Sequence, residues 1–121
     1  MASRAAPKST LITLFEQVNI AAHGNAISSA AIDLTGYDNY RLVLRLDGAA
    51  GTPFTINEGY GPAGAVQQLN INTDGGVVDS LGSLNYRGQF TVYGPKAMFI
   101  RVFNNGNAPL QLSGSLYAVQ L

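Results

Sequence analysis

The chain has 121 residues, with seven basic and seven acidic side chains, one histidine and no cysteine. Its length fits one domain, because a chain of this size buries roughly two thirds of the surface that it exposes when unfolded. The formal net charge of zero gives no support for binding to nucleic acid or to an anionic membrane surface. The lack of cysteine excludes a disulfide framework, a thiol nucleophile and a cysteine-ligated metal.

Charged residues make up 12% of the chain, whereas a typical soluble domain has about 25%. Amides, hydroxyls and glycine supply the remaining polarity. A protein near zero net charge is poorly protected against association, so the composition favours a surface that other subunits cover. The alternative is a small neutral monomer that its amides and hydroxyls keep in solution.

The N-terminal segment 1–9 mixes small residues, two cations and Pro7, and we interpret it as a flexible arm before a β-sandwich domain at 10–121. The apolar run Leu11–Phe15 is too short for the hydrophobic region of a signal peptide, and no stretch approaches the length of a membrane span. We therefore expect neither a signal peptide nor a transmembrane segment.

Eight segments have the composition or the alternation of β-strands, with turn residues between them. The clearest is Tyr40–Asp47, in which four apolar side chains alternate with Arg41, Val43, Arg45 and Asp47. The predicted strands are 10–20, 26–34, 40–47, 54–58, 66–72, 83–93, 97–103 and 110–121. A further short strand over 77–81 is an open alternative. The sequence predicts an all-β, single-domain antiparallel β-sandwich of about eight strands with a jelly-roll-like arrangement.

Turn chemistry separates these strands. The segment Gly59–Gly64 is expected to be irregular, and Asp74-Gly75-Gly76 is expected to be a turn. Gly88 inside a predicted strand suggests a β-bulge or a close backbone approach. The Asn- and Gly-rich segment 104–109 lies between the last two strands and predicts a hairpin that closes the chain.

Metal ligands are scarce. Zinc requires three or four nitrogen, sulfur or oxygen ligands, and His23 is the single histidine. Asn72, Asp74 and Asp79 form a weak calcium candidate, but their spacing does not match an EF-hand loop, and turn formation explains Asp-Gly equally well. We favour the turn interpretation and expect no metal and no other cofactor.

No catalytic constellation emerges from the sequence. A Ser-His-Asp triad would need His23, which lies in a Gly-Asn turn and beside no nucleophile elbow. The glycine-rich loops that bind phosphate are absent. The acidic residues neither support nor exclude a pair of carboxylates for glycoside hydrolysis. We therefore expect a protein that is not an enzyme.

Arg101 is the most informative charged residue. Phe99 and Phe103 lie on its own face of the predicted strand, and the opposite face is apolar as well. A strand that is apolar on both faces is covered on both sides, and an arginine there must be paired or must reach an edge. We therefore expect Arg101 to form an ion pair, either within the fold or between subunits.

These two possibilities remain equal at this point, because buried arginine serves both cores and interfaces. The candidate partners within the fold are Glu58, Asp33 and Asp47. In the second case Arg101, Arg41 and Arg45 would pair across subunits. Separately, Tyr37, Tyr60 and Tyr93 stand in predicted turns, where exposed rings can stack on sugars, fill a protein interface or cover the ends of the sandwich.

The segments IDLTGYDNYRLVLRLDG, GTPFTI and FTVYGPKAMFIRVFNNGNAPLQLSGSLYAV resemble small β-sandwich proteins of virus particles, including bacteriophage capsid-decoration and tail-associated proteins. The resemblance rests on strand length, Gly/Asn turns, low charge and the lack of cysteine. It implies a non-enzymatic structural protein that forms a homo-oligomer and contacts other structural subunits, in a virion or in the host cytoplasm during assembly. In these same features the chain is similar to carbohydrate-binding and adhesin sandwiches, so a module that binds a glycan or another surface polymer is the alternative.

Overall fold

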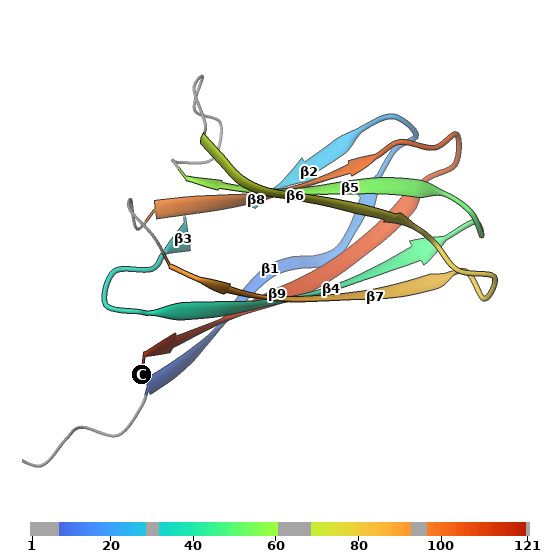
Figure 1. The fold of residues 1–121 in the computed structure, drawn as a ribbon. Coiled ribbons are helices and arrows are strands. Elements are labelled where there is room, and N and C mark those ends of the chain that lie inside the picture. The colour runs from blue at the N-terminus through green and yellow to red at the C-terminus, as the bar shows by residue number, and fades with distance from the viewer. Residues whose placement is uncertain (1–7, 29–31, 61–68, 93–96, 121) are drawn as a thin grey trace, which may run out of the picture.

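The computed structural model describes residues 8–28, 32–60, 69–92 and 97–120, and it shows two antiparallel sheets packed face to face (Figure 1). These residues contain nine strands and no helix. The strands are β1 Lys8–Ile20, β2 Asn25–Ile27, β3 Ile32–Asp33, β4 Asn39–Gly48, β5 Pro53–Tyr60, β6 Leu69–Val77, β7 Ser83–Thr91, β8 Ala97–Asn104 and β9 Leu110–Gln120.

The first sheet has the order β1-β9-β4-β7, and the second has the order β2-β8-β5-β6 with β3 also paired to β8. Because β2 and β3 both pair with β8, they act as one interrupted strand, which brings the fold to the eight strands of a jelly roll. The predicted antiparallel β-sandwich with jelly-roll character is confirmed. Strand β1 begins two residues before the predicted strand, and residues 1–7 of the expected arm lie outside the described part of the chain.

The hydrophobic core lies between the two sheets. In β4, Tyr40, Leu42, Leu44 and Leu46 are at most 1% exposed and alternate with outward-facing side chains. The inward side chains of β8 and β9 meet them; these are Met98, Ile100, Val102, Leu112, Leu116 and Ala118. The two-residue alternation that predicted this strand therefore arises because one face of β4 packs on the opposite sheet.

The predicted hairpin at the end of the chain is wrong, although both of its strands are present. Strand β8 belongs to the second sheet and β9 to the first, so the segment between them crosses from one layer to the other (Figure 1). The buried side chain of Asn104 fixes this crossing. Its Nδ2 donates to the carbonyl oxygens of Ile20 at 3.1 Å and Ala108 at 2.7 Å, and its Oδ1 accepts the N–H of Gly106 at 2.9 Å.

The predicted turn at Asp74-Gly75-Gly76 is also wrong, because these residues lie within β6 and pair with Ile56, Thr55 and Phe54. Neither glycine has a positive φ. Gly76 instead makes room for an aromatic ring, since a Cβ there would lie 3.1 Å from Cζ of Phe54. The turn comes later, where Asp79 accepts the N–H groups of Leu81 and Ser83, so the alternative strand over 77–81 does not form.

The predicted strand 26–34 is two strands, with residues 29–31 outside the described part. Ser28 follows β2, and its hydroxyl accepts the N–H of Ile100 at 3.2 Å in place of a backbone carbonyl. Gly88 shows no bulge, because its pairing with Leu42 is in regular register. The ring of Phe90 covers it instead, and a Cβ on Gly88 would come within 2.7 Å of Cζ of that ring.

The irregular positions of the sheets lie elsewhere. Strand β1 shifts its register against β9 between Thr13 and Phe15 and again between Phe15 and Val18, and Gln17 there has a φ of 48°. The segment predicted to be irregular from Gly59 onward begins inside β5, where the register shifts between Glu58 and Gly59. The predicted strand 66–72 is described only from residue 69, where β6 begins.

Candidate functional site

Arg101 lies on the outer face of the second sheet, between two aromatic rings. The alternation of β8 turns three apolar side chains into the core and turns Phe99, Arg101 and Phe103 outward. Cζ of Arg101 lies 5.8 Å from the ring centroids of both phenylalanines, within the range of a cation–π interaction. Phe99 is buried, whereas Arg101 and Phe103 are half-buried. The rings therefore hold the guanidinium at the surface.

None of the ion pairs expected within the fold is present for Arg101. In the part of the chain that the structure describes, the single salt bridge joins Arg45 to Asp47. Glu58 is buried and accepts a hydrogen bond from the hydroxyl of Tyr40 at 3.3 Å. Nε of Arg101 is buried without a hydrogen-bond partner, and so is Oδ1 of Asn57, which is directly opposite Arg101 in the β5–β8 register.

Arg41 and Arg45 lie on the opposite side of the molecule, on the outer face of the first sheet. They line a shallow groove of about 1000 Å³ together with Arg87 of β7. In the register of the sheet, Arg41 is opposite Gln89 and Tyr117, Arg87 is opposite Val43, and Arg45 is opposite Ser113. Arg87 was missed in the sequence because only strand pairing brings β7 beside β4.

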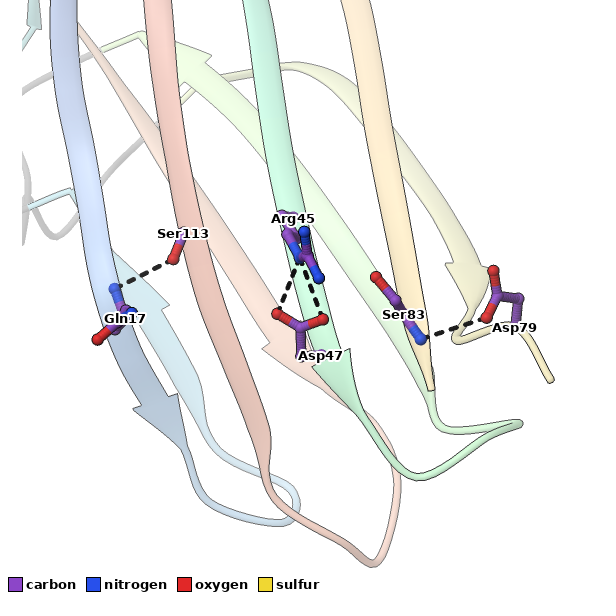
Figure 2. Close-up of polar contacts among 6 residues, drawn as sticks. All are labelled: Gln17, Arg45, Asp47, Asp79, Ser83 and Ser113. Carbon is purple, nitrogen blue, oxygen red and sulfur yellow. Dashed lines mark hydrogen bonds and ion pairs between the residues drawn. The ribbon is translucent and has the colours of Figure 1, made fainter. Parts of the chain in front are cut away.

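The groove has a positive charge. None of the described residues that line it is acidic, and Asp47 contacts Nε of Arg45 from one end at 3.1 and 3.2 Å (Figure 2). This pair is exposed, with side-chain exposures of 60% and 37%, so it contributes little to stability. Figure 2 also shows that the hydroxyl of Ser113 accepts the N–H of Gln17, which ties β9 to the irregular part of β1.

The three tyrosines that the sequence singled out do not share one position in the structure. Tyr37 is half-buried against the core, and its hydroxyl lies 2.6 Å from Oγ1 of Thr10. Tyr60 ends β5 rather than standing in a turn, and Tyr93 lies outside the described residues. Tyr117 was not singled out in the sequence, yet it is 41% exposed and lines the groove. The alternation of side chains along β9 could have placed Tyr117 on the outward face of that strand.

Two of the three weak calcium candidates, Asp74 and Asp79, bind backbone N–H groups in the structure. The backbone of Asn72 lies in β6, Asp74 accepts the N–H of Gly75, and Asp79 caps the following turn. Among the described residues, no group of three or more histidine, cysteine or acidic side chains is arranged to hold a metal ion. His23 is exposed with a φ of 61°, and its Nε2 lies 2.8 Å from Oδ1 of Asn107.

A further group of polar side chains lies in the interior and at one edge of the sandwich. Burial raises the pKa of Tyr86, and the negative charges of Glu58 and Asp74, together with a hydrogen bond to Asp74, raise it further. Glu58 and Tyr40 are fully buried, whereas Asp74 is exposed at the edge strand β6. These groups belong to the interior and to one edge of the sandwich, whereas the two arginine sites lie on its outer faces.

Several known protein structures share the fold of this chain. No protein-family profile matches the chain, and no curated protein sequence matches it. PRD1 vertex protein P5 is similar in structure, with a TM-score of 0.56, 10% identity, and coverage of 95% of this chain and 96% of that one. The CBM36-1 domain of a multidomain xylanase from the hindgut metagenome of Trinervitermes trinervoides has a TM-score of 0.54 and 8% identity, and it covers 91% and 96% of the two chains.

A third similar structure is that of the Gx strain of infectious bursal disease virus, with a TM-score of 0.52 and 12% identity. The match covers 96% of this chain but 32% of the viral chain, so the present chain spans about a third of that protein's length. The resemblance to β-sandwich proteins of virus particles is therefore confirmed as a likeness of fold. No helix in the described residues is long and apolar enough to cross a membrane.

Proposed function

We propose that this chain is a non-enzymatic structural protein that self-associates as part of a larger assembly, such as a phage particle in which it decorates the capsid or belongs to the tail. The observation that carries the proposal is Arg101 on the outer face of the second sheet. Its guanidinium is held between Phe99 and Phe103, and its Nε is buried without an acceptor.

An unsatisfied buried donor destabilises a folded protein, because it loses its hydrogen bonds to water and gains none in return. A neighbouring subunit that places a carboxylate or carbonyl over Arg101 would form charge-assisted hydrogen bonds with the exposed side of its guanidinium, which would offset the cost of the unpaired Nε. Arginine and aromatic residues are also the types enriched at the centres of protein interfaces. The outer face around β8 therefore has the properties of a subunit contact.

The likeness to PRD1 vertex protein P5 and to the infectious bursal disease virus chain supports this assignment, since both are components of virus particles. The low fraction of charged residues supports it as well, because it is typical of a surface that other chains cover.

The test is the substitution Arg101→Met, followed by light scattering over a range of protein concentrations. We expect the wild-type protein to form oligomers, alone or on a candidate particle, and Arg101→Met to stay monomeric with an unchanged or raised melting temperature. The matched control is Arg87→Met on the opposite sheet, which should assemble like the wild type. A wild-type protein that stays monomeric with and without particles would refute the proposal, and so would normal assembly of Arg101→Met.

A further inference from the structure

We propose that the groove on the outer face of the first sheet binds an acidic polysaccharide that carries carboxylate groups. The three arginines of the groove would pair with these carboxylates, and its uncharged residues would contact the sugar rings and hydroxyls. This site lies on the sheet opposite Arg101, so the inference is independent of the proposed self-association.

The spacing of the arginines fits a polymer better than a single small anion. Arg41 and Arg45 are four residues apart on one face of β4, so their Cα atoms are about 13 Å apart along the strand. Arg87 pairs with Val43, midway between them on the neighbouring strand. Successive arginines are thus separated by roughly 8 Å at the backbone. A chain with repeated carboxylates can contact all three, whereas one small anion cannot.

The charge of the groove is locally uncompensated. Among the described residues, Arg41 and Arg87 have no ion pair, and the contact of Asp47 with Arg45 uses Nε at one end of the groove. The other described residues that line the groove carry no charge, in a protein whose formal net charge is zero. Guanidinium groups bind carboxylates and phosphates through two parallel hydrogen bonds, so an arginine-lined groove favours an anionic ligand, and repeated carboxylates meet that requirement.

The uncharged part of the groove indicates a sugar rather than another polyanion. Gln89, Ser113 and Ser115 offer amide and hydroxyl groups that can both donate and accept hydrogen bonds, as sugar hydroxyls require. Tyr117 is 41% exposed, and Leu11, opposite it on β1, is 56% exposed. Together they form an apolar surface against which a sugar ring can pack. A site for single-stranded nucleic acid would need several stacking aromatic side chains, whereas Tyr117 is the single aromatic residue among the described residues that line the groove.

Isothermal titration of the wild-type chain with polygalacturonate tests the proposal, with carboxyl-reduced polygalacturonate as the matched ligand. We expect binding that weakens with salt and that falls at least about tenfold for the reduced polymer, since it loses the charge-assisted hydrogen bonds. Arg41→Gln and Arg87→Gln should each weaken binding by about tenfold. Arg101→Gln, which removes an arginine from the opposite sheet, should leave binding unchanged.

Two further ligands separate a polysaccharide from other polyanions. Polyglutamate and single-stranded DNA should bind more weakly than polygalacturonate, and Tyr117→Ala should reduce the affinity for polygalacturonate but not the weak binding of polyglutamate. Circular dichroism checks that each variant is folded. Equal binding of the carboxyl-reduced polymer, tighter binding of polyglutamate or DNA, or an absence of binding to polygalacturonate would each overturn the proposal. None of these outcomes bears on the light-scattering test of assembly.

Discussion

Gly114 tests how tightly the two central strands of the first sheet are packed. It lies in β9 between the buried residues Leu112 and Leu116, and it pairs with Leu44 of β4. A Cβ at this position would overlap Cδ2 of Leu44 and would lie 2.9 Å from the carbonyl oxygen of Val43. The side chain of Leu44 can shift, but the carbonyl belongs to β4 and is much less free to move.

We therefore expect Gly114→Ala to destabilise the protein. Overpacking a core costs about 1–3 kcal/mol, whereas the lower entropy of the unfolded chain returns about 0.4–1 kcal/mol. The free energy of unfolding should fall by about 1–2 kcal/mol, which is the approximate difference of those two effects. Urea denaturation measures it, with Ser115→Ala as a control on the outward face of the same strand, where we expect a change within about 0.5 kcal/mol.

A double-mutant cycle separates the contact with Leu44 from the contact with the backbone. Leu44→Ala alone should cost about 2–5 kcal/mol, because Leu44 is fully buried. In the double mutant the methyl group introduced by Gly114→Ala enters the space that Leu44 leaves. The double mutant should therefore lose less stability than the two single mutants lose together. Strict additivity, or a Gly114→Ala variant at least as stable as the wild type, would refute this account of the packing.

The polar contacts lead to three further predictions. Tyr86 has a raised pKa, so the folded state keeps a proton that the unfolded state loses as the pH rises through 10.0. The free energy of unfolding should therefore fall with pH above that value, and it should fall less steeply in Tyr86→Phe. Urea unfolding at neutral and alkaline pH measures both dependences. An equal fall of the free energy of unfolding with pH in both proteins would contradict this. Asn104→Ala should cost about 2–4 kcal/mol in urea denaturation, because it leaves the carbonyls of Ile20 and Ala108 and the N–H of Gly106 without their partner. A loss below that of the Ser115→Ala control would contradict it. Asp47→Asn should change stability by less than about 1 kcal/mol, since its pair with Arg45 is exposed, and a larger loss would show an additional role for that carboxylate.

The candidate sites were predictable only in part. The alternation of residues in β8 and β4 correctly placed Arg101 with Phe99 and Phe103, and Arg41 with Arg45, on shared faces. Alternation along a single strand does not tell which strand lies beside it. Arg87 and Tyr117 therefore could not be joined to Arg41 until the β4–β7 and β4–β9 registers were known.

The sequence by itself determined the strands that bury one face, because a period of two residues needs no partner to be recognised. Tyr40–Asp47 is such a segment, whereas the strands on either side of the segment 104–109 were predicted from their apolar, β-rich composition. The tertiary structure alone decided what those strands pair with. Asn and Gly residues allow the chain to reverse direction, but they do not specify whether the next strand returns to the same sheet or crosses to the other. The hydrogen bonds of Asn104 to Ile20 and Ala108 decide that, and Ile20 lies far from Asn104 in the sequence. In the same way, Gly75 and Gly76 lie inside β6 because of their pairing with β5, which local turn propensity cannot show.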